Sequence, residues 1–216
     1  MKSQSSPSSV LSWVAVHEWR VALAVMTAAL CLSLFGIGNR IDNLGTFVFP
    51  ETIPFWLLSS ILFGVTIAMA TVYRGPNHIL QVLRVKSPVR RARALWLLFA
   101  VGVSTLCSTV IACLDNDAVL TVMTLNTLLF AGIALSVVVL GFPLLAWFVP
   151  ALLLLLAMGF GFPEHAADNE WYPWASFLST ELTAMRYAIS CGVFFSAAVV
   201  YVMKVRPLRR TLVAAD

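Results

Sequence analysis

Charged residues are scarce in this sequence. Only 11% of its 216 residues are Asp, Glu, Lys or Arg, whereas 60% are hydrophobic. A soluble globular domain carries about twice that share of charge, and so few charges cannot cover the surface of a soluble protein of this size. The mean hydropathy of +0.91 leads to the same conclusion. We therefore predict an integral membrane protein in which residues 1–216 form a single transmembrane domain.

Sequence motifs for catalysis are also missing. The chain has no Gly-x-x-x-x-Gly-Lys-Ser/Thr pattern, so we do not expect it to hydrolyse nucleotides. None of its four cysteines belongs to a Cys-x-x-Cys pair, and apart from Asp115, two residues after Cys113, no His or carboxylate is near them in the sequence. Cysteines in apolar runs are typically small packing residues. We therefore expect a protein that is not an enzyme and that holds no metal or cofactor.

Long uncharged runs predict the membrane-crossing segments, called spans below. A transmembrane helix needs about 20 consecutive apolar residues. The uncharged run 118–163 is too long for one helix, and Gly141-Phe142-Pro143 is a natural break within it. The six predicted spans are 21–39, 52–73, 94–114, 118–140, 143–160 and 183–203. The fold class predicted is an all-α bundle of six transmembrane helices.

The charges predict how this bundle is oriented. With a cytoplasmic N-terminus, all of the 14 Lys and Arg residues except Arg40 and Arg186 lie in cytoplasmic segments, and all acids except Glu18 and Asp216 lie outside. This distribution follows the positive-inside rule. We therefore place both termini in the cytoplasm and the chain in the plasma or inner membrane, as a multi-pass protein of a bacterium. Arg186, near the start of the sixth span, is expected to extend to the outer membrane interface.

The interiors of the spans contain no Asp, Glu, Lys, Arg or His. Ion-coupled transporters and intramembrane metalloproteases depend on such groups, so neither class is favoured. The milder polar residues of spans three and four are expected to form hydrogen bonds between helices, worth about 1 kcal/mol each, or alternatively to line a substrate path. These residues are Ser104, Thr105, Ser108, Thr109, Thr121, Thr124 and Asn126. If the chain transports a substrate actively, the energy is expected to come from another subunit.

The segment 74–93 between spans two and three is the most informative part of the sequence. Residues 78–85 form a short amphipathic stretch. Ser87-Pro88 then favours a helix start, because Ser is a good N-cap and proline fits the first turn. The basic residues that follow lead directly into span three. One interpretation is a basic cluster that contacts anionic lipid, and the other is a docking element for a soluble partner.

This segment resembles the cytoplasmic connection in permease subunits of ABC-2-type exporters. In that family a leucine-rich short helix is followed by a Pro-Val-Ser-Arg-Arg-like group and then by the third span. Here Leu80 and Leu83 are followed by Ser87-Pro88-Val89-Arg90-Arg91. The family also begins with an amphipathic helix at the inner surface that often carries a Glu-Trp-Arg-like group, and this chain has Glu18-Trp19-Arg20.

The resemblance implies a specific architecture and specific partners. It implies short amphipathic helices before span one and between spans two and three. It also implies a second six-span subunit, identical or homologous, and cytoplasmic ATPase subunits, with the lipid bilayer around them and no nucleic acid. The outer segment between spans five and six, here 161–186, is expected to contain a short helix at residues 171–182, and in the family this region dips into the membrane and covers the exit. The residues expected to dock the ATPase are Leu80, Leu83, Arg84, Ser87, Pro88, Val89, Arg90, Arg91, Glu18, Trp19 and Arg20.

These features leave three candidate functions. The first is the membrane-spanning permease subunit of an ATP-driven exporter that is powered by a separate ATPase subunit. The second is the substrate-binding six-span subunit of a vitamin-type uptake system, which would bind its vitamin tightly as an isolated chain. The third is a non-transporting membrane protein with an assembly or immunity role, for which only the absence of a defining motif speaks.

Overall fold

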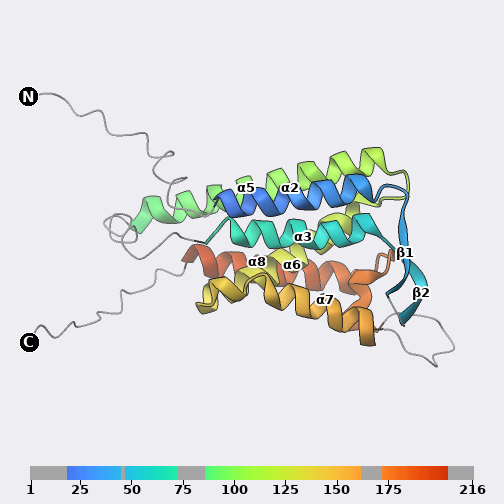
Figure 1. Ribbon diagram of the computed structural model, residues 1–216. Coiled ribbons are helices and arrows are strands. Elements are labelled where there is room, and N and C mark those ends of the chain that lie inside the picture. Colours follow the sequence, from blue (N-terminus) through green and yellow to red (C-terminus); the bar gives the residue numbers. More distant parts are fainter. Residues whose placement is uncertain (1–18, 45–46, 73–85, 162–171, 204–216) are drawn as a thin grey trace, which may run out of the picture.

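The computed structural model describes residues 19–44, 47–72, 86–161 and 172–203 (Figure 1). These residues form six α-helices, two 3₁₀ helices and one two-stranded antiparallel sheet. In chain order the elements are α2 (Trp19–Phe35), β1 (Arg40–Leu44), β2 (Phe47–Pro54), α3 (Phe55–Met69), α5 (Lys86–Leu114), α6 (Leu120–Leu140), η2 (Pro143–Leu145), α7 (Phe148–Phe160), η3 (Pro173–Leu178) and α8 (Ala184–Met203). The predicted helical class is confirmed, with the β1–β2 hairpin as an addition that the sequence did not reveal.

The six α-helices run side by side, and their direction alternates along the chain (Figure 1). The hairpin, the α5–α6 turn and η3 lie at one end of the bundle, which we call the outer end. The starts of α2 and α5 and the end of α8 lie at the opposite end, called the inner end. The first and last described residues, Trp19 and Met203, are therefore at the same end.

Four helical segments are long and apolar enough to cross a membrane, which makes the chain a multi-pass membrane protein by length and composition. These segments are Arg93–Leu114, Leu120–Leu140, Pro143–Phe160 and Ala184–Met203. They agree closely with the last four predicted spans. The first two predicted spans correspond to the shorter apolar helices Arg20–Phe35 and Phe55–Met69.

The β1–β2 hairpin explains why the first two helices are shorter than predicted. Helix α2 ends at Phe35 rather than at residue 39, and Gly38 has a positive φ of 70°, a conformation that glycine adopts without strain. The chain then forms the hairpin, in which Arg40 pairs with Pro54. Proline disfavours helix in the residue before it, so the second helix begins at Phe55, after Pro54, and not at residue 52.

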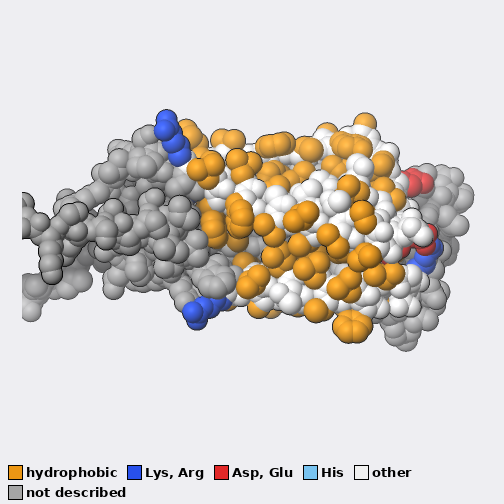
Figure 2. Space-filling view, turned by 90° about the horizontal axis from the view of Figure 1, so that it is seen from above, with side chains coloured by type: hydrophobic (Ala, Val, Ile, Leu, Met, Phe, Trp, Pro, Cys, Tyr) orange, Lys and Arg blue, Asp and Glu red, His pale blue; other side chains and the backbone are white. Residues whose placement is uncertain are grey.

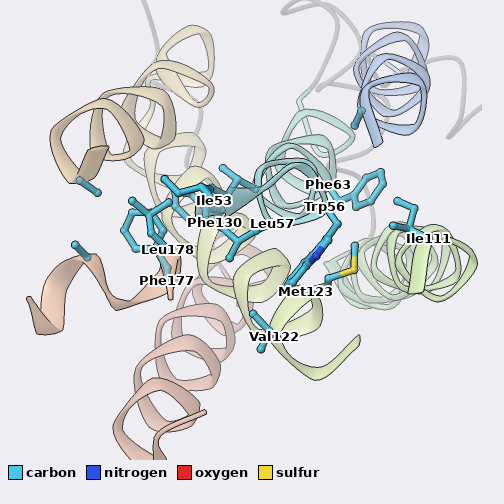
Figure 3. Close-up of a cluster of buried hydrophobic side chains, with 14 residues drawn as sticks. Ile53, Trp56, Leu57, Phe63, Ile111, Val122, Met123, Phe130, Phe177 and Leu178 are labelled. Atoms are coloured by element: carbon cyan, nitrogen blue, oxygen red, sulfur yellow. The ribbon is translucent and has the colours of Figure 1, made fainter. Parts of the chain in front are cut away.

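Helices α3 and α6 form the centre of the bundle. α6 packs against α3 and α8, and α3 also packs against α2 and α5. Figure 3 shows the main cluster of buried side chains, in which residues of α3, α5 and α6 meet Phe177 and Leu178 of η3. Within it, Phe63 and Phe130 are fully buried. The hydroxyl of Thr127 in α6 also donates a 3.1 Å hydrogen bond to the carbonyl of Ser60 in α3.

The outer surface of the bundle is apolar. Leu98, Phe99 and Leu106 of α5 and Leu155 of α7 are each more than 60% exposed. On the face shown in Figure 2, hydrophobic side chains cover the length of the helices, while the charged side chains shown lie at the two ends. A soluble monomer rarely exposes so large an apolar area. Such a surface suits contact with lipid chains.

The predicted break between the fourth and fifth spans is confirmed. Helix α6 ends at Leu140, and Gly141 takes the left-handed conformation with a φ of 108°. The amide of Gly141 donates to the carbonyl of Val138, and that of Phe142 donates to the carbonyl of Val137, each at 3.1 Å. This is the Schellman pattern that closes helix ends at glycine. Pro143 then begins η2 and the helical segment that continues into α7.

Candidate functional site

Arg186 is the charged residue that the structure places most unexpectedly. Its side chain was expected to extend to the outer membrane interface, and this expectation is wrong. Arg186 is only 4% exposed, in the first turn of α8. Its guanidinium donates four hydrogen bonds: from Nη1 to the carbonyls of Ser179 and Glu181, each at 2.8 Å, and from Nη2 to Oδ1 of Asn126 at 2.8 Å and to the carbonyl of Phe177 at 3.3 Å.

The partners of Arg186 come from two separate elements. Asn126 lies on α6, six residues after its start and so about 9 Å along the helix axis. Its Nδ2 donates a 2.9 Å hydrogen bond to the carbonyl of Phe177. Phe177 and Ser179 lie at the C-terminal end of η3, where carbonyl groups lack donors within the helix. Arg186 and Asn126 together satisfy these carbonyls. We call Asn126, Arg186 and the carbonyls of residues 177, 179 and 181 the arginine network.

Local capping positions Arg186 at the start of α8. The hydroxyl of Thr183 accepts a 3.2 Å hydrogen bond from the amide of Arg186, three residues later, which is the usual geometry of an N-cap. The hydroxyl of Ser179 accepts in the same way from the amide of Glu181, at 3.0 Å. These short-range bonds fix the turn between η3 and α8, and the turn presents its carbonyls to the guanidinium.

Helix η3 returns into the bundle rather than extending away from it. Ala175, Phe177 and Leu178 are buried, and the ring of Phe177 meets that of Phe130 edge to face, with centroids 5.0 Å apart. Phe130 lies ten residues after the start of α6, about 15 Å along its axis. The amide of Tyr172 donates to the carbonyl of Gly161 at 2.9 Å, which draws the start of η3 to the end of α7. η3 therefore closes the outer end of the bundle.

Other polar residues of the third and fourth spans do not connect helices as expected. Thr105, Ser108, Thr109 and Thr124 each donate to the carbonyl four residues earlier in their own helix. For these four residues the predicted interhelical hydrogen bond is wrong. The prediction is confirmed for Asn126.

The inner end holds the described part of the segment predicted to dock an ATPase. Ser87, Pro88, Val89, Arg90 and Arg91 all belong to α5, close to its start at Lys86, and Arg91 is exposed. The expected helix start near Ser87-Pro88 agrees with this position. Leu80, Leu83, Arg84 and Glu18 lie outside the described residues.

Trp19 and Arg20 are not part of a separate surface helix in the described chain. They are the first two residues of α2, which is the first helix of the bundle. The amphipathic helix predicted before span one would extend over residues 10–20, of which 10–18 lie outside the described residues.

Two contacts fasten the inner half of α5 to neighbouring helices. The indole Nε1 of Trp96 donates a 2.7 Å hydrogen bond to the carbonyl of Ala70, at the end of α3. Nη1 of Arg93 donates to the carbonyl of Tyr201 near the end of α8, at 3.3 Å, and its guanidinium lies 5.6 Å from the centre of the Tyr201 ring. The inner ends of α3, α5 and α8 are therefore directly connected.

No metal site is evident in the part of the chain that the structure describes, because no three His, Cys, Asp or Glu residues group there as ligands. No protein-family model, curated protein or solved structure matches this chain. The fold and charge distribution define its class as a multi-pass helical membrane protein. Its candidate functional features are the arginine network, the inner end of α5, and η3 at the outer end, which we call the outer cover.

Proposed function

We propose that this chain is the membrane-spanning permease subunit of an ATP-driven exporter, powered by a separate cytoplasmic ATPase subunit. The observation that carries this proposal is the continuity of α5. Its 29 residues extend about 43 Å, whereas the hydrocarbon core of a bilayer is about 30 Å thick. The basic start of α5 therefore has the length to extend beyond the lipid core at the inner end while its apolar part spans it.

A continuous helix transmits a displacement from one end to the other. If an ATPase binds at Ser87–Arg91, its movement acts directly on α5. The Trp96–Ala70 hydrogen bond passes this movement to α3, and the contacts of Arg93 with Tyr201 pass it to α8. α8 carries Arg186 at its outer end. A nucleotide-driven step at the inner end thus has a mechanical route to the arginine network.

The outer end is consistent with a closed state of such an exporter. η3 fills the space over the start of α8 and packs against Phe130 in the middle of α6. In the proposed function this is the cover over the exit for a hydrophobic or amphipathic substrate. A second six-span subunit, identical or homologous, would complete the path between the two halves.

The proposal is tested by purifying the tagged full-length chain from its native membrane in mild detergent. We expect an ATPase subunit, identified by mass spectrometry, to co-purify in stoichiometric amount and to hydrolyse ATP. The double variant Arg90→Glu, Arg91→Glu should lose this subunit, because it reverses the charge at the predicted docking segment. The matched control is Arg40→Glu at the outer end, where Arg40 is exposed and paired with Asp117.

The outcomes separate the proposal from its competitors. Retention of the ATPase by Arg40→Glu and its loss from the double variant would support docking at the start of α5. Recovery of the wild-type chain without any ATPase would contradict the proposal and favour a non-transporting role.

A further inference from the structure

Arg186 is buried, and among the described residues it makes no ion pair. No Asp or Glu side chain among the described residues is in ion-pair contact with it, and its partners are carbonyl groups and one amide. Glu181 contributes its backbone carbonyl, while its side chain is exposed. Burying an unpaired charge is costly, and ionisable groups within membrane segments usually have a functional role. The carbonyl and amide acceptors are neutral, so they do not neutralise the positive charge of the guanidinium.

The same region also has unused hydrogen-bonding capacity. Nε of Arg186 and the hydroxyl of Ser190 are both buried and have no hydrogen-bond partner. Ser190 is only 1% exposed and lies four residues after Arg186 on α8, about 6 Å along the axis and on the same face. Buried polar atoms in native proteins are rarely left unsatisfied. Within the described part of the chain, Nε of the Arg186 guanidinium and the Ser190 hydroxyl, one helical turn apart, are therefore two buried donors that lack an acceptor.

We propose that Arg186 and Ser190 form a binding site for an oxyanion, the headgroup of an amphipathic molecule. A phosphate or carboxylate group is the natural complement, because it accepts several hydrogen bonds and a guanidinium binds it with a rigid fork of donors. Asn126 holds the guanidinium at the level of α6 through its Oδ1. The site lies between the outer starts of α6 and α8, beneath η3.

The site is closed in this structure, because Arg186 is occupied by the carbonyls of residues 177, 179 and 181. An entering oxyanion would exchange these bonds for stronger charged ones and release η3 from α8. The inference deepens the proposed function by naming an anionic amphiphile as the class of cargo. It also implies that the cargo and the carbonyl groups at the end of η3 compete for the guanidinium of Arg186.

The test measures binding to the purified full-length chain alone, without an ATPase. Native mass spectrometry in neutral detergent would follow titration with phosphatidylglycerol, with phosphatidylcholine as the uncharged reference. We expect Arg186→Gln to weaken the tightest phosphatidylglycerol adduct by about tenfold or more, as for the loss of a charged donor. Arg40→Gln and Arg91→Gln are the controls for anionic lipid bound at the outer and inner ends. Each should change the affinity of the tightest phosphatidylglycerol adduct less than twofold.

A second arm uses inorganic phosphate and measures the midpoint of thermal unfolding. A rise with phosphate that depends on Arg186 would show that the site takes the free anion. A response to phosphatidylglycerol alone would show that the headgroup binds only with its acyl chains. Both results support an oxyanion site at Arg186. They distinguish free phosphate from a lipid headgroup as the source of the oxyanion.

Ser190→Ala keeps the test decisive if Arg186→Gln fails to fold. This variant removes an unpartnered hydroxyl, so it should fold like the wild type, and we expect it to weaken the adduct about threefold. The proposal is overturned if Arg186→Gln folds and binds both probes like the wild type. If Arg186→Gln does not fold, the proposal is overturned when Ser190→Ala binds both probes like the wild type. Because no ATPase is present, this failure is distinct from the failure of the exporter proposal.

Discussion

Gly132 of α6 lies directly against the backbone of Phe194 in α8. A Cβ atom placed on Gly132 would come within 2.8 Å of both the N and the Cα of Phe194, closer than real Cβ atoms approach other atoms. On α3, a Cβ atom on Gly64 would lie 2.6 Å from the carbonyl oxygen of Thr127 in α6. Small residues allow membrane helices to approach this closely. α6 therefore contacts both of its main neighbours through a glycine.

Gly132→Ala should separate α6 from α8. The added methyl group meets backbone atoms, which cannot rotate away, so we expect a loss of about 1–3 kcal/mol in the free energy of unfolding. The measurement is reversible unfolding in mixed micelles with increasing denaturing detergent. Gly192→Ala on α8 is the matched control, because a Cβ at that position has no neighbour within 4 Å. Equal stability of the two variants would show that the close approach is not needed.

Asn126→Ala should destabilise the outer end of the bundle. The change removes the hydrogen bond from Arg186 and the one to the carbonyl of Phe177. We expect a cost of about 2–3 kcal/mol, because the lost partners include a buried charged group. Thr124→Val is the control on the same helix. Its hydroxyl bonds only within α6, and we expect a change within about 0.5 kcal/mol.

The outcome for Asn126→Ala can be located by hydrogen exchange. Faster exchange of the amides in residues 172–183, with α3 unaffected, would confirm that the arginine network holds the outer cover. Uniform acceleration over all helices would instead point to a general loss of packing and would contradict a local role.

The ion pair between Arg40 and Asp117 should contribute little to stability. Its atoms are 2.6 Å apart, but the two side chains are 52% and 61% exposed. Exposed pairs are worth about 0–1 kcal/mol because water and salt screen them. Asp117→Asn should therefore lower the free energy of unfolding by less than about 1 kcal/mol, and the difference should shrink at high salt. A loss as large as that of Asn126→Ala would show that the hairpin depends on this contact.

The orientation of α5 is open to a labelling test. Arg91 and Asp117 are both exposed; Arg91 lies near the inner end of α5, and Asp117 follows its outer end. In a chain whose four native cysteines are replaced by alanine, we expect Asp117→Cys to react with a membrane-impermeant maleimide in intact cells. Arg91→Cys should react only after the membrane is permeabilised. Labelling of both positions in intact cells would contradict a crossing by α5 and the assignment of the inner end to the cytoplasm.

The later part of the fold was predictable because its signals are local. Uncharged runs predicted α6, α8 and the apolar part of α5 to within a few residues, and Gly141 set the end of α6. The earlier part was less predictable. Residues 40–51 fell between the first two predicted spans and contain Arg40, Asp42 and Glu51, so they were expected only to connect two helices. A lone strand pair cannot be recognised by hydropathy when both neighbours are membrane helices.

The site was only partly predictable. Asn126 is an isolated amide within an apolar helix, and its interhelical role followed from that alone. The burial of Arg186 did not follow, because it depends on η3 folding back over the start of α8. This return path brings together residues 60 positions apart in the sequence. The sequence signal that was available is one amide, Asn126, in the fourth predicted span and one arginine, Arg186, in the sixth, each near the outer end of its span.

Trp96→Phe should weaken the coupling between the inner end and the rest of the bundle. The variant retains an aromatic ring to stack on Phe99, whose ring centre lies 5.7 Å away. It loses the hydrogen bond to the carbonyl of Ala70, which we expect to cost about 1 kcal/mol. In the proposed exporter, the ATPase should still co-purify and hydrolyse ATP, but the cell's export phenotype should decline, because α5 would move without drawing α3 with it.

Trp147→Phe is the control, since that indole is 54% exposed and its described ring contact is with the adjacent Phe148. Full export by Trp96→Phe would mean that movement reaches the bundle by another route, and the contacts of Arg93 with Tyr201 would then be the next to test.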